Sequence, residues 1–124
     1  MITTDTETRA TIARHNDKFR RHPGSDWMVT ASVQAKGPIF VLGAASAVGA
    51  FDAFTGDNEP HGENDFGAFE LCGERLLWKI DYYDKDIRYG ADDPADPVNT
   101  MRVLTIMFAS EYRGSSPASA GFFL

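Results

Sequence analysis

The sequence predicts one α+β domain, in which two helices pack on one face of a roughly four-stranded, mainly antiparallel sheet in the order α-β-α-β-β-β. Three observations lead to this fold class. The chain has 124 residues, near the common size for a single hydrophobic core, and it is 43% hydrophobic. Two segments have helical spacing or composition, and several others alternate in character along the chain. We expect residues 1–112 to form the domain and residues 113–124 to form a flexible tail.

A first helix is predicted over residues 5–22. Ile12, Asn16 and Phe19 fall at i, i+4 and i+7, so they share one face, and Phe19 is the expected anchor in the core. The second half of the helix carries basic residues, which suit the C-terminal end of a helix: Arg14, Lys18, Arg20 and Arg21. This helix is therefore expected to pack on the sheet through a narrow apolar stripe.

A second helix is predicted over residues 39–54, which are rich in alanine. Pro38 suits the first helical position, because the N–H that proline lacks would have no helical partner there. Gly43 and Gly49 weaken the helix, since glycine costs about 1 kcal/mol relative to alanine in a helix interior. We expect a buried helix whose small residues allow it to lie close to the sheet.

Four segments are predicted to be strands. Residues 27–33 alternate in the manner of a half-buried strand. Residues 66–71 and 75–83 are joined by a short turn that contains glycine, as in a β-hairpin. Residues 101–112 form a final apolar strand, or a strand that continues into a helix. The alternation also places both tryptophans in the core.

Charge is distributed unevenly along the chain. Between Asp52 and Asp96 there are thirteen acidic and four basic residues, so this segment has a net charge of −9, whereas the whole chain has −6. Such a concentration of one sign usually faces a partner. It disfavours direct binding of nucleic acid, which needs clustered Lys and Arg, and it favours a basic protein surface or a cation as the partner.

The composition also bears on cellular location. No apolar run approaches the roughly 20 residues that cross a bilayer, and the polar, acidic start lacks the form of a signal peptide. The single cysteine, Cys72, cannot form an internal disulfide. We therefore expect a cytoplasmic protein that has no membrane partner and needs no cofactor.

The loop 55–67 carries a candidate metal or catalytic site. Compared with an EF-hand calcium loop, Asp57, Glu59 and His61 fall at positions 1, 3 and 5, but the glutamate of position 12 is replaced by Ala68. A turn in which acids accept backbone hydrogen bonds explains the same residues, so we expect neither a bound metal nor a catalytic residue. The candidates for a metal site or acid–base pair are His61, Glu63 and Asp65.

The acidic segment is the leading candidate for a binding site. Tyrosines lie among the acids, and aromatic residues beside charges are typical of binding surfaces. Carboxylates two residues apart on an extended chain are about 6.6 Å apart, which lets them imitate a row of phosphates, although lysine and arginine interrupt the row. A solvated face that only aids solubility is the alternative. The predicted partner-binding residues are Asp57, Glu59, Glu63, Asp65, Asp81, Tyr83, Asp84, Asp86, Tyr89, Asp92, Asp93 and Asp96.

Five distinctive segments run through this part of the chain. They are residues 51–63 (FDAFTGDNEPHGE), 65–70 (DFGAFE), 78–84 (WKIDYYD), 92–97 (DDPADP) and 102–107 (RVLTIM). Together they resemble DUF3768, a family of small bacterial proteins of unknown function, and the resemblance covers residues 14–112. Asn64 stands where the family pattern often has histidine, so the resemblance implies one imidazole fewer here for a metal or catalytic site.

The resemblance implies no established activity. It implies a gene of bacterial plasmids and integrative elements, whose small acidic proteins are often anti-defence factors that imitate DNA. We therefore expect a non-enzymatic acidic protein that inhibits a nucleic-acid-binding defence complex, of the anti-CRISPR or antirestriction type, by presenting an acidic surface to a basic nucleic-acid site. A small metal-dependent or acid–base enzyme centred on residues 61–65 and a regulatory interaction subunit are the alternatives.

Overall fold

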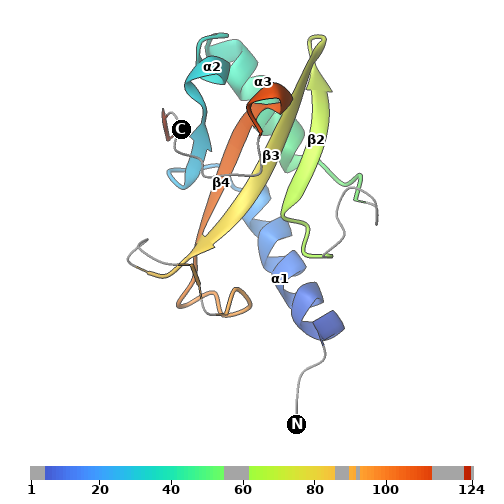
Figure 1. The fold of residues 1–124 in the computed structure, drawn as a ribbon, viewed down its shortest axis with the longest axis vertical. Coiled ribbons are helices and arrows are strands. Elements are labelled where there is room, and N and C mark those ends of the chain that lie inside the picture. Colours follow the sequence, from blue (N-terminus) through green and yellow to red (C-terminus); the bar gives the residue numbers. More distant parts are fainter. Residues whose placement is uncertain (1–4, 55–61, 86–89, 92, 113–121, 124) are drawn as a thin grey trace.

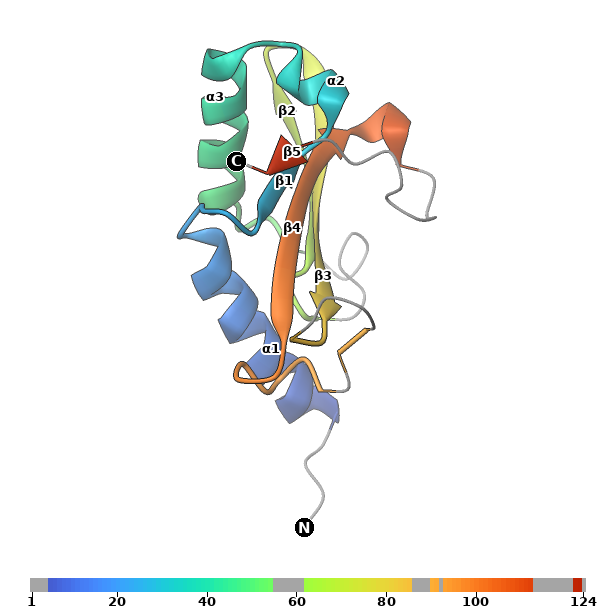
Figure 2. The ribbon, with the colours of Figure 1, turned by 90° about the vertical axis from the view of Figure 1, so that its left-hand side faces the viewer.

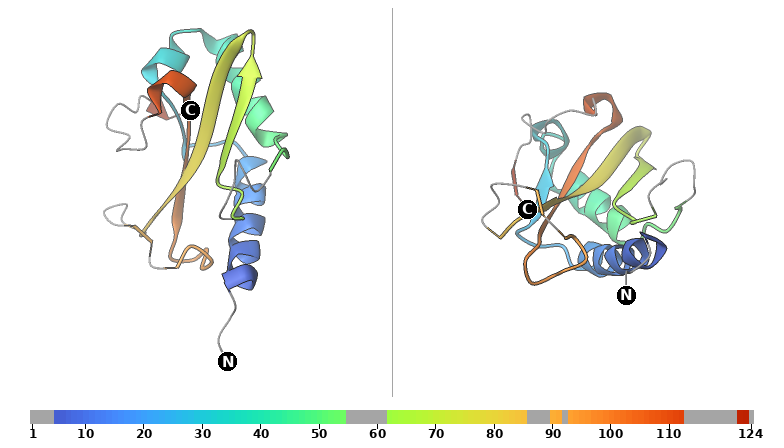
Figure 3. Two further views of the ribbon diagram at one scale, coloured as in Figure 1. Left: turned by 45° about the vertical axis from the view of Figure 1, so that its right-hand side comes forward. Right: turned by 60° about the horizontal axis from the view of Figure 1, so that its bottom comes forward.

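The fold is known from a computed structural model, which describes residues 5–54, 62–85, 90–91, 93–112 and 122–123. The elements are, in chain order, α1 (Asp5–Arg20), β1 (Trp27–Val29), α2 (Ala31–Gln34), α3 (Pro38–Gly49), β2 (Phe66–Leu71), β3 (Glu74–Tyr83), β4 (Met101–Phe108), the 3-10 helix η1 (Ala109–Glu111) and β5 (Phe122–Phe123). The predicted α+β fold class is confirmed (Figure 1). α1 and α3 lie on the same side of the sheet, beside opposite ends of it (Figures 2 and 3). None of the helices in the described ranges is long and apolar enough to span a membrane.

The sheet has the strand order β2-β3-β4-β1-β5 and is mainly antiparallel. β2, β3 and β4 form an antiparallel meander. The turn between β2 and β3 consists of Cys72 and Gly73, whose φ angles of +53° and +80° are those that a two-residue type I′ hairpin turn requires. β1 pairs with β4 in parallel, with Trp27 opposite Leu104, and this pairing makes the sheet mixed.

The hydrophobic core lies between α3 and the sheet. α3 buries residues at i, i+3, i+4 and i+7, the spacing of one helix face: Val41, Ala44, Ala45 and Val48. They belong to one cluster with alternate residues of β3 and β4. Trp27 and Trp78 are both fully buried, as predicted. Gly67 is required beside Trp78, because a Cβ at this position would collide with the indole and with the ring of Phe51.

The strand predicted over residues 27–33 is too long. β1 ends at Val29, and the chain then turns into the short helix α2. The carbonyl of Thr30 accepts a hydrogen bond from the N–H of Gln34 at 2.9 Å, which starts the helical turn. Val33 is therefore directed into the core from the helix α2 and not from a strand, and it is fully buried.

The helix predicted over residues 39–54 ends earlier, at Gly49. Arg20 of α1 is buried there and donates from Nη1 to the carbonyl of Val48 at 2.9 Å and to that of Phe51 at 2.8 Å. Carbonyls at a helix C-terminus run out of regular helical partners, so Arg20 adds a side-chain donor at the end of α3. The sequence groups Arg20 with the cations of its own helix end and does not reveal this buried role.

The segment predicted to be a flexible tail, residues 113–124, is described only in part. Phe122 and Phe123 form β5, whose backbone pairs in antiparallel fashion with Val29 and Met28 of β1. Residues 113–121 and 124 lie outside the described residues. β5 therefore adds a fifth, two-residue strand beside β1.

Candidate functional site

Three acidic segments lie at one end of the sheet. β2 begins at this end, β3 finishes there and β4 begins there, because the three strands are antiparallel neighbours. The segments 62–65, 81–84 and 93–96 are therefore at the same end of the sheet, the lower end in Figure 1. We call this region the acidic end. Its described carboxylates are Glu63, Asp65, Asp81, Asp84, Asp93 and Asp96.

Glu63 and Asp65 turn toward Tyr82 of β3. The Tyr82 hydroxyl lies 3.1 Å from Glu63 Oε1 and 3.3 Å from Asp65 Oδ2, and it accepts a hydrogen bond from Asn16 Nδ2 at 2.8 Å. Burial raises the pKa of Tyr82 well above its ordinary value of 10.0, and the charge of Asp65 adds to this effect. The phenol therefore keeps its hydrogen and donates it to one of the two carboxylates.

Asn16 connects Tyr82 to Arg102 of β4. Arg102 Nε donates to Asn16 Oδ1 at 2.7 Å, and its Nη2 donates to the carbonyl of Pro94 at 2.5 Å. The Arg102 guanidinium also lies 5.3 Å from the centre of the Tyr82 ring. Asn16 is fully buried, and burial lowers the pKa of Arg102. We call these residues the Tyr82 network: Asn16, Glu63, Asp65, Tyr82 and Arg102.

Sequence reasoning does not find the Tyr82 network as a unit. Two of its members carry a signal, however, because each is a polar residue at an apolar position. Asn16 lies on the same helix face as Ile12 and Phe19, and Arg102 is the only charged residue of β4. A buried polar side chain is expected to find a hydrogen-bonding partner, so such positions indicate polar contacts across the core.

The predicted metal or acid–base site lies only partly within the described ranges. Three of its residues are outside them: Asp57, Glu59 and His61. Among the residues that the structure describes, no group of three or more His, Cys, Asp or Glu is placed to hold a metal ion. Glu63 and Asp65 converge on the Tyr82 hydroxyl. Asn64, with a φ of +56°, donates to the two carboxylate oxygens of Asp17 at 3.1 and 3.2 Å.

Asp93 and Asp96 stabilise turns within their own loop. Asp93 Oδ1 accepts a hydrogen bond from the N–H of Ala95 at 3.1 Å, and Asp96 Oδ1 accepts one from Val98 at 3.0 Å. This is the local pattern in which aspartate replaces a backbone turn partner. The Asn99 side chain donates to Asp96 Oδ2 at 2.8 Å and, together with the Val98 contact, lowers the pKa of Asp96.

The end of β3 holds three of the remaining predicted residues. Asp81 forms an ion pair with Lys79, which interrupts the row of carboxylates as the sequence indicates. Tyr83 forms an isolated β-bridge with Gly90, and both Tyr83 and Asp84 are half-buried. The other predicted partner-binding residues lie outside the described ranges: Asp57, Glu59, Asp86, Tyr89 and Asp92.

The family comparison covers most of the sheet and the whole of the acidic end. The sequence profile of a family described as "Protein of unknown function (DUF3768)" matches residues 29–111. The match begins after α1, so Asn16 lies outside it. No curated protein and no solved structure matches the chain significantly. Because the match spans more than half of the sequence, the chain belongs to the DUF3768 family of proteins of unknown function.

Proposed function

We propose that this protein is a non-enzymatic, DNA-mimicking inhibitor of the anti-CRISPR or antirestriction type, which covers the basic nucleic-acid site of a defence complex with its acidic end. One observation carries the proposal: the antiparallel order of β2, β3 and β4 brings three acidic segments to one end of the sheet. The part of the chain that supplies them has a net charge of −9. A surface of one sign steers and orients a partner of the opposite sign.

The acidic end divides into a supporting part and a contact part. Glu63 and Asp65 are held by Tyr82, which fixes residues 63–65 just before β2. Asp93 is exposed and Asp84 is half-buried, so both carboxylates contribute negative charge at the surface of the acidic end. A basic partner would meet charges on a backbone that is already ordered, which lowers the entropic cost of association.

The resemblance to DUF3768 implies a gene carried by mobile elements, and this setting agrees with the proposed inhibitor. Such elements meet host defence complexes whose nucleic-acid channels are rich in Lys and Arg. The cluster at the acidic end has the sign of charge that such a channel attracts. Binding of this kind weakens as salt rises, because screening shortens the reach of exposed charges to about 8 Å at physiological ionic strength.

The test uses two double variants that remove the same amount of charge. D84N/D93N neutralises the contact part, and asparagine keeps the side-chain oxygen that Asp93 offers to the N–H of Ala95. E70Q/E74Q is the control: these glutamates lie beside the hairpin turn at the other end of the sheet, in ion pairs with Arg75 and Lys36 that are partly exposed. Ion pairs of that kind contribute little to stability.

Tagged protein is used to capture partners from host lysate at low salt, and the captured complex is then tested for DNA binding by mobility shift. We expect a basic, nucleic-acid-binding complex that releases DNA when wild-type protein or E70Q/E74Q is added. D84N/D93N should need about tenfold more protein, since two rim charges contribute about 1.4 kcal/mol together. Equal inhibition by D84N/D93N and the wild type would contradict the role of the acidic end.

A further inference from the structure

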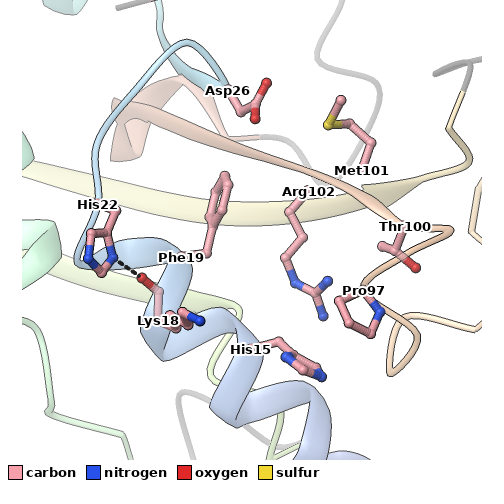
Figure 4. Close-up of a pocket in the computed structure, with 9 residues that line it drawn as sticks. All are labelled: His15, Lys18, Phe19, His22, Asp26, Pro97, Thr100, Met101 and Arg102. Atoms are coloured by element: carbon pink, nitrogen blue, oxygen red, sulfur yellow. Dashed lines mark hydrogen bonds between the residues drawn. The ribbon is translucent and has the colours of Figure 1, made fainter.

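A pocket of about 520 Å³ opens between α1, the turn that follows it and the segment that leads into β4 (Figure 4). We call it the α1 pocket. Pockets that hold small molecules usually have volumes of about 300–1,000 Å³. The α1 pocket therefore has the size of a site for a small organic molecule.

Basic side chains line the α1 pocket, although the chain as a whole is acidic. His15 and Lys18 of α1 and His22 just beyond it fall at i, i+3 and i+7, so they share one side of the helix. Arg102 reaches the pocket from β4, on the opposite wall (Figure 4). Among the described lining residues, Asp26 is the one acid. The charge of this site is thus opposite to that of the acidic end.

Arg102 is a cation that is nearly removed from water. Its exposed fraction is 7%, and its hydrogen bonds go to the neutral oxygens of Asn16 and Pro94. Within the described residues no carboxylate forms an ion pair with Arg102. Glu63 favours its charged state from beyond ion-pair distance. A buried charge is costly without a counter-ion, so an anion entering the pocket would be stabilised by Arg102.

His22 is oriented by the end of α1. Its Nδ1 lies 2.8 Å from the carbonyl oxygen of Lys18, as the dashed line in Figure 4 shows. A carbonyl oxygen only accepts hydrogen bonds, so Nδ1 carries the hydrogen. The ring of His22 is therefore held in one orientation at the wall of the pocket.

The remaining walls are apolar. Phe19 and Met101 are half-buried side chains on opposite sides of the pocket, and Pro97 adds a third apolar surface. A few polar groups that orient a ligand, set among apolar walls that hold its carbon skeleton, are the usual design of a small-molecule site.

We propose that the α1 pocket binds a small organic oxyanion, a carboxylate or a phosphate ester, with its oxygens on Arg102 and Lys18 and its carbon skeleton against Phe19 and Met101. The charge of Asp26 disfavours molecules that are anionic at both ends. The site shares Arg102 with the Tyr82 network, and its test does not depend on the identity of the defence complex.

The proposal is tested by following backbone amide signals in NMR titrations at constant ionic strength. The probes are phenyl phosphate, benzoate and benzylamine, which share an aromatic ring and differ in charge. Both anions are expected to give saturable shifts at residues 15–22 and 98–102, whereas benzylamine should give none. Shifts that do not saturate, or shifts of the same residues with benzylamine, would overturn the proposal.

Two variants with the same change of charge locate the site. K18Q removes a cation that lines the pocket, and the affinity for phenyl phosphate should fall about tenfold, the usual worth of a charge-assisted hydrogen bond. R21Q is the control, because Arg21 is exposed near the same helix end but does not line the α1 pocket. Its affinity should stay within about twofold of the wild type. If K18Q and R21Q lowered the affinity for phenyl phosphate equally, the anion would be attracted by the overall positive charge of this helix end and not by the pocket. That result would overturn the proposal.

Discussion

The two ends of the helix-covered face of the sheet are held by different interactions. Toward α3, β3 presents Trp78, which is part of an apolar cluster. Toward α1, the same strand face presents Tyr82, which is hydrogen-bonded to Asn16 and lies beside Arg102. α3 thus docks by burying apolar area, whereas α1 combines the burial of Ile12 and Phe19 with directed hydrogen bonds. One strand therefore supports an apolar core at one end and a hydrogen-bonded network at the other.

Arg20 links these two regions. It is buried at the C-terminal end of α1, and its guanidinium lies 5.1 Å from the ring centres of both Phe54 and Trp78. Its Nη2 also contacts Asp17 at 2.6 Å. The contrast can be tested by substitutions that remove buried apolar area around Trp78 and by substitutions that remove hydrogen bonds from the Tyr82 network.

The largest effect is expected from Trp78→Ala. It removes a fully buried ring that packs edge-on against Phe51 and Phe54, so the free energy of unfolding should fall by about 3–5 kcal/mol in urea titrations. Trp78→Phe, which keeps a ring, should cost less than half as much. A loss below about 1 kcal/mol for Trp78→Ala would contradict close packing at the α3 end.

Asn16→Ala is expected to come next, with a loss of about 2–3 kcal/mol. It leaves the Tyr82 hydroxyl, Arg102 Nε and the carbonyl of Glu63 without the partner that Asn16 provides. Arg14→Ala, an exposed change on the same helix, should stay within about 0.5 kcal/mol of the wild type in the same urea titration. If the two variants were equally stable, α1 would not depend on the Tyr82 network.

Tyr82→Phe should have a smaller effect, about 1 kcal/mol, because it removes only the hydroxyl. The pKa of Tyr82 is raised in the folded state above its ordinary value of 10.0. The protonated phenol therefore stabilises the fold fully below that pH, and this contribution disappears as the pH rises above it. Urea titrations on both sides of this value should show stability falling more steeply with pH in the wild type than in Tyr82→Phe. Parallel pH profiles would argue against burial of the hydroxyl.

The smallest effect is expected at Asp96, in the exposed loop. The hydrogen bonds from Asn99 and Val98 lower its pKa below the ordinary value of 3.8, so its contribution to stability is present above that pH and declines as the pH falls below it. An NMR titration of the carboxyl carbon should show this low pKa in the wild type and a shift toward 3.8 in Asn99→Ala. If the pKa of Asp96 were the same in Asn99→Ala as in the wild type, the Asn99 side chain would not be the cause of the low pKa.

The local parts of the fold could be predicted because their patterns are local. The alternation in residues 75–83 and the glycine in the turn lead directly to the β2–β3 hairpin, and the face of Ile12, Asn16 and Phe19 is the face by which α1 packs. The break after Val29 could not be predicted, because the same residues suit a strand until Thr30 begins a helical turn. Tertiary contacts override propensity at such positions.

The candidate sites show the same limit. The number of acidic residues in the sequence predicts the acidic end. The contacts of Glu63 and Asp65 with the Tyr82 hydroxyl could not be predicted, because they depend on how β2 and β3 pair. Arg102 is the one charged residue of the apolar strand β4. Only the folded structure shows that its side chain lines the α1 pocket. Sequence patterns report periodicity and composition, whereas these contacts depend on which segments the topology brings together.

The parallel pairing of β1 with β4 has a consequence for folding during synthesis. Trp27 pairs with Leu104, which lies 77 positions later, so β1 has no partner in β4 until most of the chain has left the ribosome. Until then the indole of Trp27, which is fully buried in the finished fold, has no sheet to cover it. Contacts of such long sequence separation form slowly, because a long loop must close first. Trp27 therefore gains its parallel neighbour in the sheet only after β4 has been synthesised, late in translation.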